Sequence, residues 1–245
     1  MLLTPRELLQ TTVALYRKEF WLFLGYAAWL LVPVAVFYFA SSLPPNPVTT
    51  VLIVVTVVLQ LFVWLWIMVC LMKTTGLLFE QKPVDPHTLS TVSLRRIQPL
   101  LGVVFLQALI YLGGFLLLVI PSIIFWVWYS LAQVATGLSD KRPIESLTIS
   151  RSLVVGRFWI VCWRLVAGPV VMGLLYAFVS GLILFALSGL FGADLDVVFS
   201  DSPPLWASLI QSITDIFFIP LFIIYGVLLY LDLTSHPVEK AAPVT

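Results

Sequence analysis

Charged residues are scarce in this sequence. Only 10% of the 245 residues are Asp, Glu, Lys or Arg and 61% are hydrophobic, whereas a soluble domain carries about 25% charged residues. No charged residue occurs between positions 20 and 72 or between positions 97 and 139. Because a membrane-spanning helix needs roughly 20 apolar residues, these runs exclude a soluble protein and predict an all-α, multi-pass membrane protein.

Cysteine and histidine are nearly absent. The chain has two of each, Cys70, Cys162, His87 and His236. Structural zinc sites take four closely spaced cysteine and histidine ligands, which these isolated residues do not supply. Both cysteines are expected near cytoplasmic helix ends, where reducing conditions disfavour a disulfide. We therefore predict no metal site and no cofactor.

Catalytic motifs are missing as well. The sequence contains no Walker loop and no HExxH, GxSxG or CxxC motif. An intramembrane enzyme would need acid and base groups paired within one site, whereas the apolar segments hold a single carboxylate. The sequence therefore predicts a non-enzymatic protein that does not bind nucleic acid, and it leaves protein partners and the oligomeric state open.

Six apolar segments are long enough to cross a membrane. The first uncharged run holds two segments separated by SSLPPNPVTT, and the second run holds two separated by a turn near VIPS. Two more follow at 158–188 and 205–231, each interrupted by one charge. We expect six transmembrane helices in a single domain, residues 1–245, that ends in a cytoplasmic tail at 234–245.

The basic residues predict the orientation, because Lys and Arg stay on the cytoplasmic side of a membrane. They lie before the first segment, between the second and third, between the fourth and fifth, and in the tail. The loops on the opposite side carry no basic residue, and one of them holds Asp194, Asp196 and Asp201. We predict that both termini are cytoplasmic and that the protein resides in the cytoplasmic (inner or plasma) membrane.

One sequence pattern occurs twice in the chain. TPRELLQTTVALYRKEFW (4–21) aligns without a gap with RPIESLTISRSLVVGRFW (142–159), and both contain Pro-x-Glu near the start and Phe-Trp at the end. A third, weaker copy is VDPHTLSTVSLRRIQPLL. Proline in the first turn, preceded by a capping residue, is typical of a helix start. Each copy predicts an amphipathic helix in the cytoplasmic interface of the membrane.

Each of these interfacial helices is followed by one span outward and one span back. We expect this unit three times, at 4–81, 82–139 and 142–233. All three units begin on the cytoplasmic side, so the predicted internal repeats are parallel, unlike the inverted repeats of many transporters.

The segment VIPSIIFWVWYSLAQVATGLSDKRPIESLTISRSLVVGRFW and the later IPLFIIYGVLLYLDL resemble a known family. The chain is similar to the six-span membrane domain associated with glycerophosphoryl diester phosphodiesterases and to its stand-alone, uncharacterised bacterial and archaeal relatives. The resemblance implies a six-span fold. In that family the phosphodiesterase activity belongs to a separate soluble domain, and no soluble segment of this chain is long enough to be one, so the activity is not expected here.

Two charges fall inside predicted spans. Asp215 lies near the bilayer centre, and Arg164 lies roughly 8 Å in from the cytoplasmic side at about 1.5 Å per residue. A charge inside a membrane is a functional-site hypothesis by default. Because the two segments are consecutive and antiparallel, we predict an Arg164–Asp215 ion pair beside a polar stripe of Ser208 and Gln211. Such a pair would either fix two helices or form part of a proton or ion relay.

Paired basic residues accompany the predicted interfacial helices. Each Lys or Arg near a membrane surface gains about 1 kcal/mol against anionic lipid, so these pairs predict contacts with anionic lipids. They are Arg17, Lys18, Arg95, Arg96, Lys141 and Arg142.

Small residues recur at every fourth position of the fifth apolar segment. Gly173, Ala177 and Gly181 form the spacing that lets a neighbouring helix approach closely. We predict that this ridge packs against another helix.

Two functions are consistent with these features. The leading interpretation is a lipid-interacting or membrane-organising protein, and the alternative is a small transporter or channel whose pathway passes Asp215. A cavity that reaches Asp215 would favour the transporter, whereas an ion pair that seals Asp215 would favour the organising protein.

Overall fold

The computed structural model describes residues 2–117, 119–139, 141–200 and 203–237. All regular structure in these residues is helical, as the sequence predicts. Asp201 and the part of the predicted tail at 238–245 lie outside the described residues.

The helices expected from the repeated sequence pattern are present. In α1 (Pro5–Lys18), Thr4 and Glu7 form a capping box and proline occupies the first turn. Proline also begins α5 (Pro86–Leu94), which Asp85 caps, and α9 (Pro143–Val154), whose N-cap residue makes no side-chain cap. The helix starts are therefore confirmed, whereas the threefold repeat stays a prediction.

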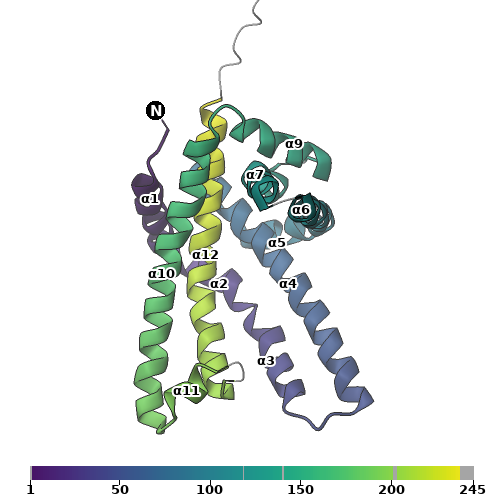
Figure 1. The fold of residues 1–245 in the computed structure, drawn as a ribbon, viewed down its shortest axis with the longest axis vertical. Helices are drawn as coiled ribbons and strands as arrows, with labels where there is room; N and C mark the ends of the chain where they lie inside the picture. The colour runs from purple at the N-terminus through teal and green to yellow at the C-terminus, as the bar shows by residue number, and fades with distance from the viewer. Residues whose placement is uncertain (1, 118, 140, 201–202, 238–245) are drawn as a thin grey trace, which may run out of the picture.

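Four apolar segments run along the long axis of the molecule (Figure 1). They are α2 (Phe20–Ala28) with α3 (Leu31–Ser41), α4 (Pro47–Phe79), α10 (Phe158–Phe191) and α12 (Leu205–Ser235). The first segment is divided at Trp29 and Leu30, just before Pro33. Proline lacks a backbone N–H and its ring clashes with the preceding turn, which explains the break. The short α11 (Leu195–Val198) lies between α10 and α12.

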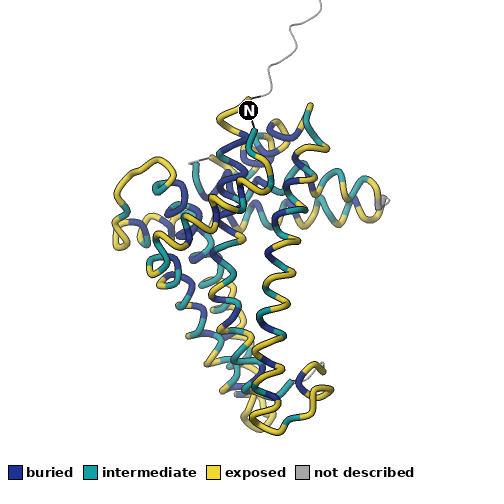
Figure 2. Tube along the Cα trace, turned by 90° about the vertical axis from the view of Figure 1, so that its left-hand side faces the viewer, coloured by how far each residue is buried: buried dark blue, intermediate teal, exposed yellow. Residues whose placement is uncertain are grey.

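The segments predicted as spans three and four have a different arrangement. They form α6 (Ile97–Leu117), α7 (Val119–Tyr129) and α8 (Ala132–Leu138). Figure 1 views α6 and α7 end-on, and Figure 2 shows this hairpin projecting sideways from the long helices. Within the described residues, five helical segments are long and apolar enough to cross a membrane, and α7 is not among them. A multi-pass membrane protein is thus supported, but six spans are not confirmed.

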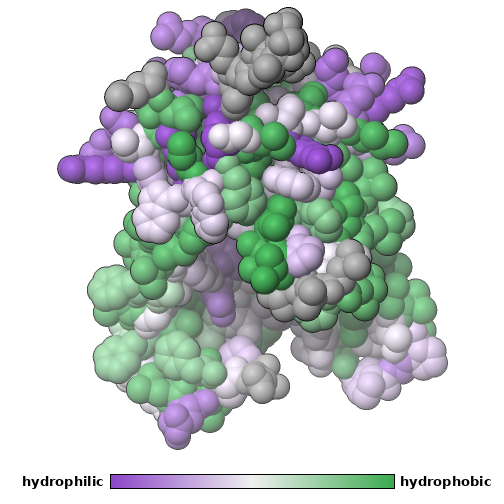
Figure 3. Space-filling model, turned by 45° about the horizontal axis from the view of Figure 1, so that its top comes forward, coloured by the Kyte–Doolittle hydropathy of each residue, from purple (hydrophilic) through white to green (hydrophobic). Residues whose placement is uncertain are grey.

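The core lies at one end of the molecule. Buried residues concentrate in the upper part of Figure 2, where α1, α4, α8 and α12 meet, while the lower parts of the long helices are largely exposed. Of the most apolar stretch of α12, 61% is buried, against 17% in α4 and in α10. The central helix is therefore α12. Figure 3 shows hydrophilic side chains around the upper end and hydrophobic side chains on the flanks below, as expected for helices that face lipid.

Candidate functional site

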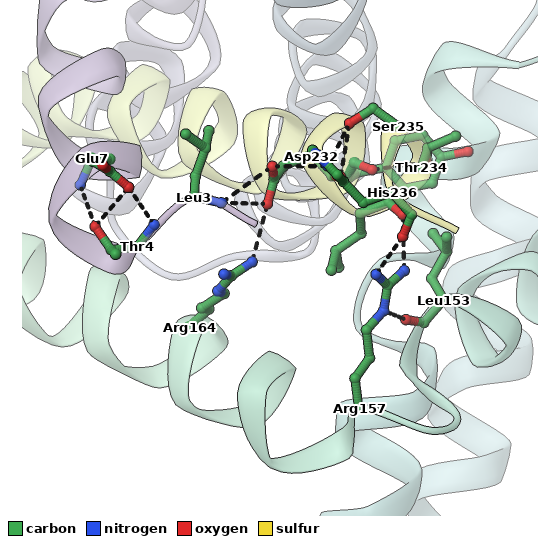
Figure 4. Close-up of polar contacts among 12 residues, drawn as sticks. Leu3, Thr4, Glu7, Leu153, Arg157, Arg164, Asp232, Thr234, Ser235 and His236 are labelled. Atoms are coloured by element: carbon green, nitrogen blue, oxygen red, sulfur yellow. Dashed lines mark hydrogen bonds and ion pairs between the residues drawn. The ribbon is translucent and has the colours of Figure 1, made fainter. Parts of the chain in front are cut away.

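The first candidate residue, Arg164, is paired with a different carboxylate from the one predicted. Its Nη1 donates a hydrogen bond to Oδ2 of Asp232 at 3.0 Å, and the two side chains are only 6% and 4% exposed. The backbone N–H of Leu3 lies 3.2 Å and 3.4 Å from the two oxygens of the same carboxylate (Figure 4). The predicted Arg164–Asp215 pair is therefore wrong.

Helix length explains this correction. α10 and α12 are antiparallel neighbours of 34 and 31 residues. Measured from the end where α10 stops and α12 starts, Arg164 and Asp232 both lie roughly 40 Å along the axis, and Asp215 only roughly 15 Å, at about 1.5 Å per residue. The predicted pair assumes that both helices just cross a hydrophobic core of about 30 Å. Because α10 and α12 are longer than this core, Arg164 and Asp215 lie farther apart along the axis than the prediction requires.

The Arg164–Asp232 pair lies in a closed polar network. The hydroxyl of Tyr225 donates to the backbone oxygen of Arg164 at 2.7 Å. Arg157 donates to the carbonyl oxygens of Leu233 at 2.8 Å and His236 at 2.6 Å, at the C-terminal end of α12. Basic side chains commonly bind the last carbonyls of a helix. The network thereby ties the N-terminal segment, the start of α10 and the end of α12 together (Figure 4).

Asp232 escaped prediction because of its place in the sequence. It directly follows the last predicted apolar segment, 205–231. A carboxylate at that position is expected to lie on the cytoplasmic surface. Asp232 can be recognised as the partner of Arg164 only from its position along the axis of the antiparallel helix pair. That position depends on the residues at which α10 and α12 begin and end.

Asp215 lies in a different environment. It accepts a hydrogen bond from the hydroxyl of Tyr176 on α10 at 2.7 Å, and Nε2 of Gln211 lies 3.4 Å from the same hydroxyl. Asp215 and Gln211 therefore share a polar face, as the predicted stripe requires. Among the described residues, the side chain of Ser208 makes no contact with this hydroxyl or with Asp215, although its backbone oxygen accepts a hydrogen bond from Ser212 at 2.9 Å. Tyr176 was missed by sequence reasoning, because its side chain is half apolar.

Asp215 faces a groove of about 490 Å³ between α12 and the α3–α4 pair. In Figure 1 these elements diverge below α2, and Figure 3 shows the molecule hollowed between its two lower parts. Most of the wall is apolar, and the polar side chains are Gln60, Ser212 and Asp215. The lining residues are Leu30, Leu31, Val34, Val57, Gln60, Leu61, Trp64, Ser212, Asp215, Ile216 and Ile219.

No cation neutralises Asp215 within the part of the chain that the structure describes: the ion pairs there join Arg164, His236 and Lys82 to Asp232 and Glu80. The same residues contain no group of three or more His, Cys, Asp or Glu side chains that could hold a metal ion. The site can therefore accept a hydrogen-bond donor, a proton or an organic cation at one carboxylate.

The predicted lipid-contact residues all lie at the end of the molecule where Asp232 is buried. Arg17 and Lys18 end α1, while the others precede α6 and α9. All six except Arg96 are exposed. Contact with anionic lipid stays a prediction. The six residues are Arg17, Lys18, Arg95, Arg96, Lys141 and Arg142.

Comparison of the chain with known protein families, curated proteins and solved structures finds no match. The resemblance to the phosphodiesterase-associated membrane domain therefore stays a prediction that rests on the sequence alone.

Proposed function

We propose that the protein is a small, non-enzymatic transporter of the cytoplasmic membrane and that Asp215 is its ligand-binding group. The observation that carries this proposal is the position of Asp215, half-buried in a groove among membrane-embedded helices and free of any ion pair within the described residues. A charge inside a membrane is costly unless it is paired or neutralised. A carboxylate in this position is best suited to bind a proton or a positively charged ligand.

The groove chemistry favours a hydrophobic cation. Leucine, valine and isoleucine side chains form most of its wall and would contact the apolar part of a ligand. Trp64 lines the groove as well, and indole faces attract organic cations. Because one carboxylate can hold either a proton or the ligand cation, we propose that the two compete for Asp215, which couples transport to proton movement.

The charge distribution supports the proposed topology. Every described basic residue lies in α1, in or directly before α9, beside α5 or at the adjoining ends of α4 and α10, whereas the segment that precedes α12 carries Asp194 and Asp196. By the positive-inside rule, the end that holds Asp232 is cytoplasmic, as are both termini. We propose that four apolar segments cross the membrane and that the α6–α7 hairpin lies within the cytoplasmic leaflet.

The proposal can be tested with a pair of hydrophobic ions of similar size and opposite charge. Purified protein should bind tetraphenylphosphonium but not tetraphenylborate, and Asp215→Asn should abolish the binding. Asp196→Asn is the matched control, because Asp196 is an exposed carboxylate outside the groove. In proteoliposomes, a proton gradient should drive tetraphenylphosphonium movement faster with the unmodified protein than with Asp215→Asn, whose rate should equal that of protein-free liposomes. Equal binding of both ions, or unchanged binding by Asp215→Asn, would contradict the proposal.

A second candidate function rests on the α6–α7 hairpin. Its large apolar side chains are exposed, including Phe105, Leu112, Phe115, Ile120 and Ile123, and α9 packs beside it. This surface favours a lipid-organising role. A protein that orders lipids without binding tetraphenylphosphonium would support this second function instead of the first.

A further inference from the structure

A second pocket, of about 520 Å³, lies at the proposed cytoplasmic end of the molecule, remote from Asp215. It is formed by α4, α5, α8 and α12. Its lining residues with polar side-chain groups are Lys73, Glu80, Asp85, Thr88, Ser139 and Tyr230. The pocket therefore combines positive and negative groups with apolar walls at the level where lipid headgroups meet the protein.

Lys73 is the positive group of this pocket. It lies on α4 and is partly buried, and within the described residues its ammonium makes no ion pair or hydrogen bond. Partly buried charges are normally paired, because removal from water without a partner is costly. The pocket beside Lys73 has room for an anionic group to supply that partner.

Asp85 and Glu80 are the negative groups. The Asp85 carboxylate caps α5, and hydrogen bonds from the Thr88 hydroxyl and the His87 backbone N–H hold its pKa below the usual range. It is therefore ionised at neutral pH. Glu80 pairs with Lys82, an exposed residue outside the pocket lining. A ligand anchored at Lys73 would thus place any positive group next to Asp85.

The remaining wall is apolar and suits an acyl chain. Leu77, Leu89, Val92, Leu138 and Leu231 contribute to it. We infer that this pocket binds a phospholipid whose phosphate pairs with Lys73 and whose headgroup ammonium faces Asp85. The inference is independent of the function proposed for Asp215, since the two sites share no residue.

Native mass spectrometry of the full chain in detergent can test this inference. Phosphatidylethanolamine should bind more tightly than phosphatidylglycerol, which has a phosphate but no amine. Lys73→Gln should weaken phosphatidylethanolamine binding about tenfold or more, the loss expected for one charge-assisted hydrogen bond. Lys73→Arg should retain binding, and Lys82→Gln, the matched control, should leave it unchanged.

Competition with soluble phosphoethanolamine distinguishes a lipid-binding site from a site for small phosphorylated amines. It should not displace the lipid at equal concentration, because it lacks the acyl chains that the apolar wall would contact. Displacement by phosphoethanolamine, equal binding of both lipids, or equal loss with Lys73→Gln and Lys82→Gln would each overturn the inference. A thermal unfolding scan of each variant confirms that a lost signal reflects binding and not misfolding.

Discussion

Two carboxylates of the same helix have opposite environments. Asp232, near the C-terminal end of α12, is 4% exposed and bound by Arg164 and the Leu3 backbone N–H. Asp215, farther towards the N-terminal end, is half-buried, faces a groove and is bound by one neutral hydroxyl, that of Tyr176.

The difference separates a structural role from a binding role. The charge and hydrogen-bonding capacity of Asp232 are satisfied within the protein, so the carboxylate has nothing left to offer a ligand. Asp215 has accepting capacity directed towards a groove, and within the described residues it has no cationic partner. The partners of each carboxylate in the structure therefore indicate its role.

The largest expected effect is that of Asp232→Leu. Removing one member of a buried ion pair leaves the other charge uncompensated and typically costs 3–5 kcal/mol, whereas replacing both by apolar residues is often neutral or stabilising, roughly 1–4 kcal/mol in favourable cases. We expect Asp232→Leu to destabilise the protein by about 3–5 kcal/mol and the double variant with Arg164→Leu to recover most of it. Unfolding of the detergent-solubilised protein by denaturant measures both.

The same substitution at the second carboxylate is the matched control. Asp215→Leu leaves no buried cation without a partner, so its cost should be no more than about 1 kcal/mol, the value of one neutral hydrogen bond. Equal destabilisation by Asp215→Leu and Asp232→Leu would mean that Asp215 is also a structural residue, and the transporter proposal would lose its basis.

A glycine beside the closed network gives the next largest effect. A Cβ at Gly168 would overlap the ring of Tyr225, whose hydroxyl binds the backbone of Arg164. Overpacking of this kind costs about 1–3 kcal/mol, so Gly168→Ala should lower the free energy of unfolding by that amount. Gly173→Ala should not destabilise the protein, because a Cβ there meets no atom within 4 Å and alanine favours a helix over glycine. Equal effects would show that the contact with Tyr225 is unimportant.

The same glycines correct the predicted helix-packing ridge. A Cβ at Gly173 or Gly181 has no neighbour within 4 Å, and Ala177 is exposed. This face of α10 is therefore not packed against another helix of the described chain. Close approach occurs instead at Gly168, where the ring of Tyr225 replaces the expected backbone neighbour.

Local signals in the sequence predicted much of the fold. Thr4 with Glu7, Asp85 and the prolines at helix starts depend on nearby residues only, and the structure confirms these helix starts. Long apolar runs likewise predicted membrane-length helices. The crosswise direction of the α6–α7 hairpin was not predictable, because an apolar run carries no information about its orientation relative to the other helices.

The site was only partly predictable for the same reason. Asp215 is recognisable as a lone charge in an apolar segment. Its partner Tyr176 and the partner of Arg164 depend on the relative shift of α10 and α12 along their axes. That shift is set by packing between the helices, which a single sequence does not record.

Tyr176→Phe should have a smaller effect. It removes the only side-chain donor to Asp215 among the described residues, and a neutral hydrogen bond contributes about 0.5–1.5 kcal/mol. Tetraphenylphosphonium should still bind, since the carboxylate remains. Tyr111→Phe is the control, because its hydroxyl makes no hydrogen bond within the described chain, and it should change neither property. Complete loss of binding in Tyr176→Phe would instead make the tyrosine hydroxyl part of the ligand site.

The smallest effect on stability is expected from the capping box of Thr4 and Glu7 at the start of α1. Glu7 accepts hydrogen bonds from the backbone N–H of Thr4 at 2.7 Å and from its hydroxyl at 2.9 Å, and these bonds lower the pKa of Glu7 from its ordinary value. They also fix the chain next to Leu3, whose N–H binds Asp232.

A lowered folded-state pKa means that the ionised form of Glu7 is favoured by folding. The contribution is therefore present above the unfolded pKa of about 4.3 and is lost as the pH falls through the lower folded value. Glu7→Gln should reduce the unfolding temperature slightly at pH 7, and the difference from the unmodified protein should vanish in acid. Glu145→Gln, at the corresponding position of α9, is the control, because the N-cap residue Arg142 makes no side-chain cap there. A difference between Glu7→Gln and the unmodified protein that persists unchanged into acid would show that the Glu7 carboxylate charge does not stabilise the N-terminal segment that holds Asp232.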